Sequence, residues 1–471
     1  MTSRTETPAV AADSSVFARP YRALTCGVIL SVALVAFESL GIATVLPETA
    51  RALGGLDSYG WGLSTLMLAN IVGTVTAGRT ADRTGPWRPL LVGLLVFTTG
   101  CLLAGIAGTW LLFLAGRAAQ GLGVGAIMGM AYTVVGLAYP EHLRARMFAL
   151  LSSAWTVPSL VGPTLAAWIA AAVDWRGVFL LMLPLTAMAG LLALPAIRRL
   201  DRPDAHGAVR VGPWWKSPVA ASCALTAGTA VFLWALSLGN VFLLMLLAVV
   251  GLGITLVALR RVTPPGTFSA RRGVGAGIVV RGLLCAVYFG SEAFLPLGLT
   301  QLRHLTATQA GLGLSAGALA WVAGSAAQVK RDEAAATGGQ ARARGVAVGF
   351  TALLAGVVIT ALAVVSTAVP ALLAVVGWAV GGLGMGMAFN AATTDTMEQA
   401  ASGQEGAVSA SLQLAQTLST ALISGAGGAA IAIAHAHGSS TRTALACVFA
   451  VTAALAALGV LLSRRLGSRA A

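Results

Sequence analysis

The sequence predicts an all-α protein that crosses a membrane many times. Of the 471 residues, 57% are hydrophobic and only 10% are charged, whereas a soluble domain carries roughly a quarter charged residues. The mean hydropathy is +0.85. Long apolar runs recur along the whole chain, separated by short charged or Pro/Gly-rich breaks. A water-soluble fold could not bury this much apolar surface, so a lipid bilayer is the expected surrounding.

Runs long enough to span a bilayer can be marked in order, because a helix needs about 20 residues to cross a hydrocarbon core of roughly 30 Å. We predict fourteen, at residues 23–46, 60–78, 89–107, 110–138, 147–172, 178–197, 217–237, 240–259, 274–300, 308–329, 345–367, 370–396, 406–434 and 443–463. The first run is too long and, with Glu38, too polar for a cleavable signal, so it should remain as a span.

The choice of fourteen spans over twelve depends on the stretch from Ser217 to Leu259. It has 43 residues and no charge, which is far too long for one span and suits a tight helical hairpin. The predicted segments are a tail, a six-helix bundle, a linker, the hairpin, a second linker, a second six-helix bundle and a tail. They cover residues 1–22, 23–197, 198–216, 217–259, 260–273, 274–463 and 464–471.

The basic residues predict the orientation of the chain. With the N-terminus inside, 24 of the 30 Lys and Arg fall on the cytoplasmic side, and only Arg51, Arg176, Arg303 and Arg442 fall outside. By the positive-inside rule, both termini should be cytoplasmic and the protein should lie in the cell membrane. The net charge of +14 thus reflects topology, and we expect no nucleic-acid partner.

Neither a catalytic domain nor a metal site is expected. The loops are too short for a soluble domain, and no loop carries a cluster of His, Asp and Glu. The five cysteines lie far apart inside apolar runs, without a CxxC pair, so the prediction is no metal, no cofactor and no enzyme activity.

One loop motif resembles a known family. After the span at 60–78 the chain reads GRTADRTGPWRPLL, in which Gly78, Asp82, Arg83 and Gly85 match the first inter-helix motif of the major facilitator superfamily. Pro-Trp replaces the basic pair that usually follows the second glycine. Without the resemblance, this segment would be interpreted as a solvated basic loop. The resemblance implies two six-helix bundles around a central cavity and a role for these residues in conformational switching.

Two further motifs are similar to family patterns. FLAGRAAQGLGVG contains Arg117, Gln120 and Gly121 in the places of a motif whose buried arginine is linked to proton coupling in relatives; the alternative is a structural cation bonded to neighbouring carbonyls. VPSLVGPTLAAW keeps Gly162 and Pro163 of the motif found in exporters, although alanines replace its closing glycine pair.

The resemblance extends over nearly the whole chain to the fourteen-span drug:proton antiporter branch. It rests on FESLGIATVLPETARALGG, DWRGVFLLMLPL, FGSEAFLPLGLTQLRHLTATQAG and GLGMGMAFNAATT, and it accounts for the inserted hairpin. Transport of small molecules in exchange for protons is therefore what the resemblance implies.

Two acids lie at membrane depth and are candidates for this chemistry. Glu38 is about 15 residues, or roughly 22 Å of helix, from the inner end of its span, and Glu292 is similarly deep. A carboxyl group removed from water can bind and release a proton near neutral pH. We expect Glu38 with Arg117 to couple protons and Glu292 to face the substrate. The alternative for each acid is a neutral side chain hydrogen-bonded between helices.

Polar stripes predict which helix faces line the cavity. Arg281, Tyr288 and Glu292 share one face by their spacings of seven and four, and Gln413 and Gln416 begin a stripe of four polar residues on a later span. Tyr288 offers an aromatic ring to a cation. Arg281, close to the inner end of its helix, could instead extend its side chain to the membrane surface.

The predicted function is proton-coupled export of amphipathic, cationic small molecules by alternating access. One alternative is a proton-coupled importer of a metabolite or nutrient, against which the Gly162-Pro163 pair and the fourteen spans argue. The other is an integral membrane enzyme or a receptor, for which the chain offers no nucleophile or metal arrangement.

Overall fold

A computed structural model describes residues 15–466 except 20, 56–60, 200–216, 237, 239, 306, 335–338 and 437–439. Within that part the chain folds into helices and contains no strand. The first half consists of α1 (Arg22–Ala52), α2 (Trp61–Thr84), α3 (Trp87–Gly105), α4 (Trp110–Ala138), α5 (Glu141–Ser153), α6 (Thr156–Ala172) and α7 (Arg176–Arg198). A hairpin follows, formed by α8 (Pro218–Ala235) and α9 (Val241–Val262). The second half consists of α10 (Val274–Glu292), α11 (Leu295–Gln301), α12 (Ala307–Ala334), α13 (Gly339–Val365), α14 (Leu372–Glu398), α15 (Glu405–Ala436) and α16 (Thr441–Ser463).

Every predicted run coincides with one helix or with two consecutive helices. The run at 147–172 is divided into α5 and α6, and the run at 274–300 into α10 and α11. By length and apolar composition, ten helices of the described part could cross a membrane, or eleven if a bent pair counts as one span. The all-α membrane fold is thus confirmed, while the number of fourteen spans stays a prediction.

Polar caps begin several of these helices. The side chains of Thr109, Ser217, Asn240 and Ser440 accept a hydrogen bond from the backbone N–H three residues later, at 3.1 to 3.3 Å. The first N–H groups of a helix have no partner within it, and such a cap supplies one. The loop sequences therefore determine where α4, α8, α9 and α16 begin.

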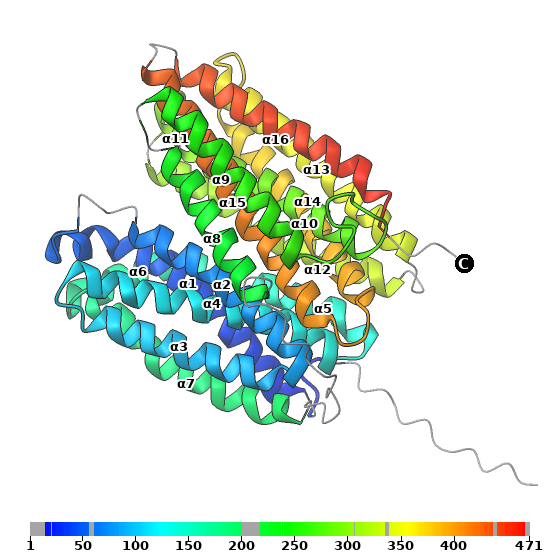
Figure 1. Cartoon of the computed structure of the whole chain (residues 1–471). Coiled ribbons are helices and arrows are strands. Elements are labelled where there is room, and N and C mark those ends of the chain that lie inside the picture. Colours follow the sequence, from blue (N-terminus) through cyan, green and yellow to red (C-terminus); the bar gives the residue numbers. More distant parts are fainter. Residues whose placement is uncertain are drawn as a thin grey trace, which may run out of the picture.

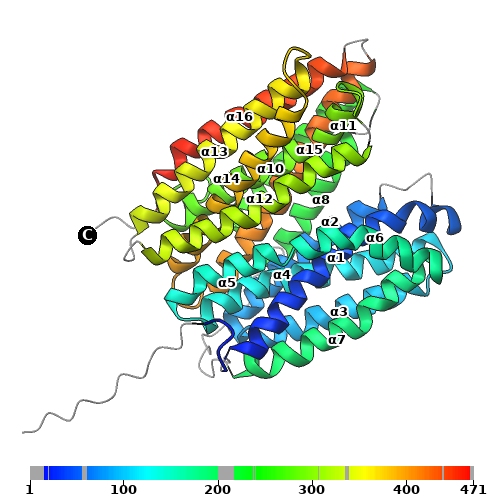
Figure 2. The ribbon, with the colours of Figure 1, turned by 180° about the vertical axis from the view of Figure 1, so that it is seen from behind.

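The two halves are helix bundles (Figures 1 and 2), each built around a cluster of buried hydrophobic side chains. The first cluster also takes in Ile278, Met397, Val408 and Leu412 of the second half, where the two halves meet. Helices α1 to α7 surround Phe97, Phe113 and Phe179, whereas α10 to α16 surround Phe350, Trp378 and Phe449. These six side chains are almost completely buried. Burial of aromatic side chains contributes most to the packing of such cores.

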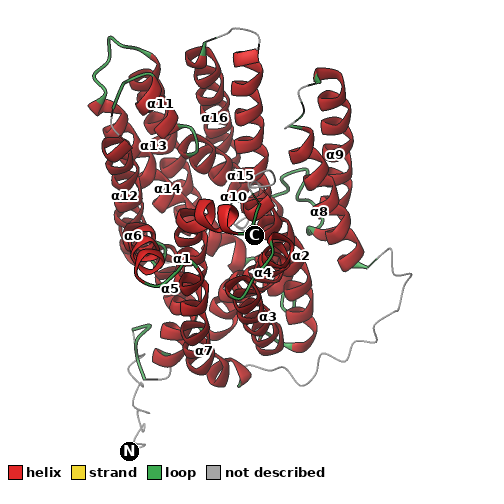
Figure 3. Cartoon of the chain, turned by 90° about the vertical axis from the view of Figure 1, so that its left-hand side faces the viewer, coloured by secondary structure: helices red, strands yellow, loops and turns green. Residues whose placement is uncertain are grey.

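The hairpin of α8 and α9 lies on one side of the molecule (Figure 3). Leu225 of α8 and Ala258 of α9 form a small cluster with Ile71 of α2 and Leu414 of α15. The Thr226 hydroxyl also donates to the Leu68 carbonyl of α2 at 3.2 Å. The hairpin therefore contacts both halves along the boundary between α2 and α15.

The halves contact each other closely at one end, which we call the basic end. It comprises the turn after α2, the start of α10 and the end of α14. There α2 and α4 pack on α15, and α5 packs on α12 and α14. Toward α6 and α11 the halves diverge (Figures 1 and 2). The backbones of the two halves are therefore farther apart on the side away from the basic end.

Candidate functional site

A cavity of about 200 Å³, measured as the space open to water-sized molecules, lies between the two halves. Helices α4, α5 and α6 line it from the first half, and α10, α12, α14 and α15 line it from the second. Because both halves contribute, any movement of one half against the other changes the shape of this cavity.

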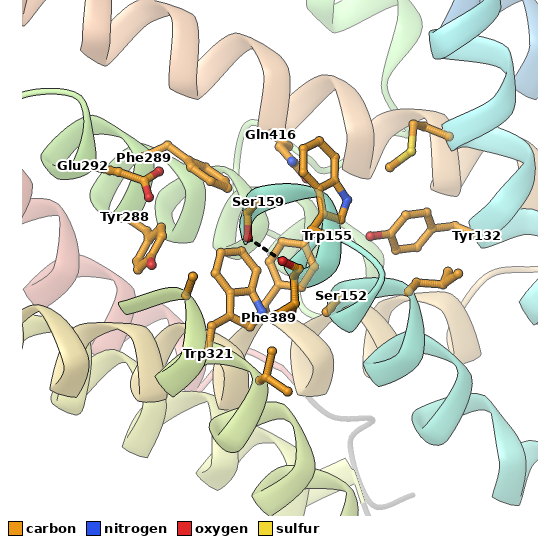
Figure 4. A pocket seen from close by; sticks show the side chains of 15 residues that line it. Tyr132, Ser152, Trp155, Ser159, Tyr288, Phe289, Glu292, Trp321, Phe389 and Gln416 are labelled. Atoms are coloured by element: carbon orange, nitrogen blue, oxygen red, sulfur yellow. Dashed lines mark hydrogen bonds between the residues drawn. The ribbon is translucent and has the colours of Figure 1, made fainter. Parts of the chain in front are cut away.

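The cavity is elongated, with different chemistry at its two ends (Figure 4). Glu292 lies at one end, and Tyr132 lies at the other. Trp155, Trp321 and Phe389 line the space between them. A mainly aromatic surface with few polar groups is typical of pockets that take lipophilic small molecules.

An aromatic cluster of the second half forms the surface near Glu292. The Tyr288 ring stacks on Trp378, with 4.6 Å between centroids, and Trp321 meets Tyr288 edge-on at 5.1 Å. Phe389 continues the cluster at 5.2 Å from Trp321. Rings held in this way by their neighbours offer fixed faces and edges to a ligand.

Glu292 is at the end of α10 and lines the cavity, as does Tyr288 one turn earlier. Within the described part, the Glu292 carboxylate has no hydrogen-bond partner and no ion pair. Of the two predicted glutamines, Gln416 lines the cavity, but Gln413 does not; its side chain is buried with Nε2 unpartnered. The predicted stripes are therefore brought together only in part.

Arg281 does not extend to the membrane surface, because its side chain is fully buried. Its guanidinium donates to the Thr393 hydroxyl at 2.5 Å, the side-chain Oε1 of Gln416 at 2.9 Å and the Tyr132 hydroxyl at 3.2 Å. It also stacks on Phe389, at 3.4 Å from the ring centroid. The snorkelling alternative is wrong, because neighbouring helices supply the partners that water would have supplied.

Glu38 and Arg117 form a buried ion pair inside the first half. Glu38 is fully buried and Arg117 is 2% exposed. Arg117 also donates to the Gly62 carbonyl at 2.9 Å and to the side-chain oxygen of Gln120 at 2.7 Å. Neither charged residue lines the cavity, and the second Glu38 oxygen has no hydrogen-bond partner. The pair is thus closed to the cavity in this conformation.

Asp82 links the two halves at the basic end. Its carboxylate accepts hydrogen bonds from the backbone N–H groups of Gly406 and Ala407, at 2.7 and 2.9 Å. These groups are in the first turn of α15, where the helix dipole favours a negative charge. Asp82 lies beyond the predicted span 60–78. Its burial between the helices raises the pKa of its carboxyl group from 3.8 to about 6.

Glycine is required at positions 78 and 85 of the motif for two different structural reasons. Gly85 has a φ of +80°, and its N–H donates to the Ala81 carbonyl, so it ends α2 in a conformation that favours glycine. Gly78 lies against Gly406 of α15: a Cβ on Gly78 would be 2.5 Å from the Gly406 carbonyl oxygen. Arg83 is exposed. Glycine at positions 78 and 406 therefore lets α2 and α15 approach each other closely.

Gly162 and Pro163 mark a bend in the chain. The segments Glu141–Gly162 and Thr164–Ala172 meet at 44°, as expected where a proline interrupts helical hydrogen bonding. Gly162 is buried beside Phe37, whereas the side chain of Pro163 lies outside the described residues. The bend follows directly after Trp155 and Ser159, which line the cavity.

Comparison with known proteins identifies the class. Residues 28–424 match the model of the Major Facilitator Superfamily, so the chain belongs to this family of membrane transporters. "Probable multidrug-efflux transporter" of Mycobacterium tuberculosis (strain ATCC 25618 / H37Rv) is 28% identical over 453 residues, 92% of each chain. "Multidrug resistance protein 3" of Bacillus subtilis (strain 168) is 30% identical over 162 residues, 34% of this chain and 32% of that protein.

The solved structures support the fold. The crystal structure of the human organic anion transporter MFSD10 aligns with a TM-score of 0.68 at 14% identity, covering 94% of this chain and 99% of that one. At this level of identity the likeness shows the fold alone. The chain is therefore a membrane transporter of the major facilitator type, with relatives named for multidrug efflux.

Several cavity residues were not predicted from the sequence, among them Trp155, Trp321, Phe389 and Tyr132. Aromatic residues in apolar spans look the same whether they face lipid, a core or a cavity. Tyr132 carried the only usable signal, since its hydroxyl is placed at membrane depth and needs a partner.

Proposed function

We propose that this protein exports amphipathic, mainly cationic compounds in exchange for protons, by alternating access. The observation that carries the proposal is that two acids, Glu38 and Glu292, have different surroundings. Glu38 is held by Arg117 in a closed site, whereas Glu292 faces an aromatic cavity without a partner of its own. One acid suits proton exchange, and the other suits a cationic substrate.

The coupling follows from the chemistry of the buried pair. Protonation of Glu38 removes the charge that compensates Arg117, and an unpaired buried charge is strongly unfavourable. The first half must then rearrange to give Arg117 other partners. A proton on Glu38 and a substrate in the cavity would in this way favour different conformations, which is the requirement for exchange.

The conformation fits one state of such a cycle. With the basic end inside the cell and both termini cytoplasmic, as the positive-inside rule favours, the closed end is cytoplasmic and the diverging end faces outward. The expected location is the plasma membrane. Alternating access then requires the contacts between α2 and α15, and between α5 and α14, to separate.

The experiment uses purified protein in proteoliposomes with an imposed pH gradient and rhodamine 6G, a lipophilic cation, as the probe. We expect the dye to accumulate in the compartment with the higher proton concentration, and the accumulation to stop when an ionophore dissipates the gradient. Movement of dye and protons in the same direction would instead establish a symporter. Dye movement unaffected by the gradient would refute proton coupling.

A further inference from the structure

Arg281 is a buried cation for which the described part of the chain supplies no carboxylate partner. The other arginine at membrane depth, Arg117, is paired with Glu38. The partners of Arg281 are uncharged: two hydroxyls, the Gln416 amide, the Phe389 ring and the neighbouring Cys285 thiol. Its Nε has no hydrogen-bond partner among the described residues. Asp395, two residues after Thr393 on α14, accepts a hydrogen bond from Gln399 at 2.7 Å and projects about 200° away around the helix. An uncompensated cation inside a membrane protein is costly and points to a function.

The position of Arg281 relates it to the cavity. Tyr132, Phe389 and Gln416, which contact its guanidinium, all line the cavity, so Arg281 lies directly behind side chains that form the cavity wall. Tyr132 belongs to the first half and Arg281 to the second. When the halves separate at the basic end, Tyr132 must move away from Arg281.

The spacing along α10 places Arg281 and Glu292 on one face. Eleven residues separate them, which corresponds to about 16 Å of helix and a rotation of about 20°. Figure 4 shows Glu292 at one end of the cavity and Tyr132, the partner of Arg281, at the other. The cavity is thus bounded by an acid at one end and a cation behind the other.

We propose that Arg281 binds an anionic group of the substrate when the basic end is open, and that the Tyr132 hydroxyl replaces this group when the basic end closes. The substrates include lipophilic zwitterions, whose cationic group lies near Glu292. The proposal rests on the proposed alternating access. It gives a role to an arginine without a carboxylate partner among the described residues: the substrate supplies its counter-charge in one state, and Tyr132, Gln416 and Thr393 satisfy its hydrogen bonds in the other.

The test compares rhodamine B, a zwitterion with a free carboxylate, with its ethyl ester, a permanent cation of nearly the same shape. Quenching of tryptophan fluorescence in purified protein reports binding of each dye, because Trp155 and Trp321 line the cavity. We expect the wild-type protein to bind rhodamine B more tightly than the ester. Arg281→Gln should lower rhodamine B affinity by about tenfold, the effect of losing one hydrogen bond to a charged group, and should change ester affinity by less than about twofold.

Arg281→Lys keeps the charge and should restore most of the preference for rhodamine B, which also controls for misfolding of the glutamine variant. Tyr132→Phe removes the competing hydroxyl but not the charge. It should lower both the KM and the kcat of rhodamine B transport, because release is slower, and leave ester transport unchanged. A purely structural role would affect both dyes alike.

Two outcomes would overturn the proposal. One is equal binding of the two dyes by the wild-type protein, including binding of neither. The other is an equal loss for both dyes in Arg281→Gln when Arg281→Lys is well folded. Failure of proton coupling is detected separately, because the binding preference is measured without any gradient.

Discussion

Glu38 and Arg117 are the only two charged side chains within the six predicted spans of the first half, and in the structure they form an ion pair with each other. We expect Glu38→Gln to abolish transport driven by a pH gradient for every substrate, because the group that takes up the proton is lost. Binding should remain measurable and become less dependent on pH. The measurement is dye uptake and dye binding in parallel between pH 5.5 and about 8.5.

The stability of that variant needs its own control. Glu38→Gln leaves Arg117 buried without a counter-charge, which we expect to cost about 3 kcal/mol. The double variant Glu38→Gln/Arg117→Gln removes both charges and should recover thermal stability, measured in detergent, without recovering coupling. If Glu38→Gln still builds a dye gradient from a proton gradient, Glu38 is structural.

Glu292 offers a second prediction at this scale. Glu292→Gln should weaken the binding of lipophilic cations by about tenfold, because a charge-assisted contact becomes neutral. Neutral lipophilic compounds should bind as before. Tyr288→Phe, which keeps the ring next to Glu292, is the matched control and should retain cation binding. Equal weakening of cations and neutral compounds would show that Glu292 shapes the cavity instead of binding the charge.

Single residues also show what the sequence could and could not predict. The pairing of Glu38 with Arg117 was predictable, because each was the only charge of opposite sign available to the other within the predicted spans of the first half. The partners of Arg281 were not. They come from α4, α14 and α15, and helical periodicity defines a face without defining the helix that the face meets.

At the scale of elements, Asp82 and the start of α15 form a contact that depends on pH. Because the pKa of Asp82 is raised from 3.8 to about 6, the closed basic end binds a proton more readily than an open, solvated one. Raising the pH from 3.8 to about 6 should therefore weaken the closed end, with no further effect above that range. Arg79, which lowers the Asp82 pKa, and Glu405, which raises it, face the same carboxylate. Asp82→Asn should remove this pH dependence, lower turnover and leave substrate affinity unchanged.

The distance between fluorophores attached on the two halves at the basic end reports the closed population as the pH changes. An unchanged pH response in Asp82→Asn would contradict the assignment to Asp82. Loss of binding at an unchanged exchange rate would contradict its assignment to the conformational change.

The crossing of α2 and α15 gives a steric prediction. A Cβ on Gly406 would lie 2.3 Å from the Gly78 carbonyl oxygen, so the helices must separate to accommodate it. We expect Gly406→Ala to shift the protein toward states with the basic end open, measured as faster cysteine labelling there. Gly428→Ala on the same helix is the control, since a Cβ at Gly428 meets nothing within 4 Å. Identical labelling of the two variants would rule out the crossing as a determinant of the equilibrium.

The elements were the best-predicted level of this structure. Apolar runs of about 20 residues specify helices in a bilayer because every backbone group must be satisfied internally. The divisions within two of the runs were missed. The break between α10 and α11 falls at Ala293–Phe294, just before Pro296, and a proline permits a break without requiring one.

At the scale of the whole molecule, single-cysteine labelling tests the predicted orientation. Basic residues flank Pro203 and Pro265 but not Gly239; Pro265 is exposed at the basic end, whereas Pro203 and Gly239 lie outside the described residues. In a chain without its native cysteines, we expect an impermeant thiol reagent to label Gly239→Cys in intact cells, and Pro203→Cys and Pro265→Cys only after the cells are opened. Labelling of Pro265→Cys from outside would reverse the orientation.

The hairpin has a consequence for how lipophilic compounds reach the protein. The halves meet along two seams, one between α2 and α15 and the other between α5 and α12. The hairpin covers the first seam (Figure 3), and the cavity is lined by α5, α6 and α12, near the second. A compound dissolved in the bilayer would therefore meet the hairpin on one side of the molecule and only α5, α6 and α12 on the other, so we expect the inserted helices to restrict sideways entry from the lipid to the second side.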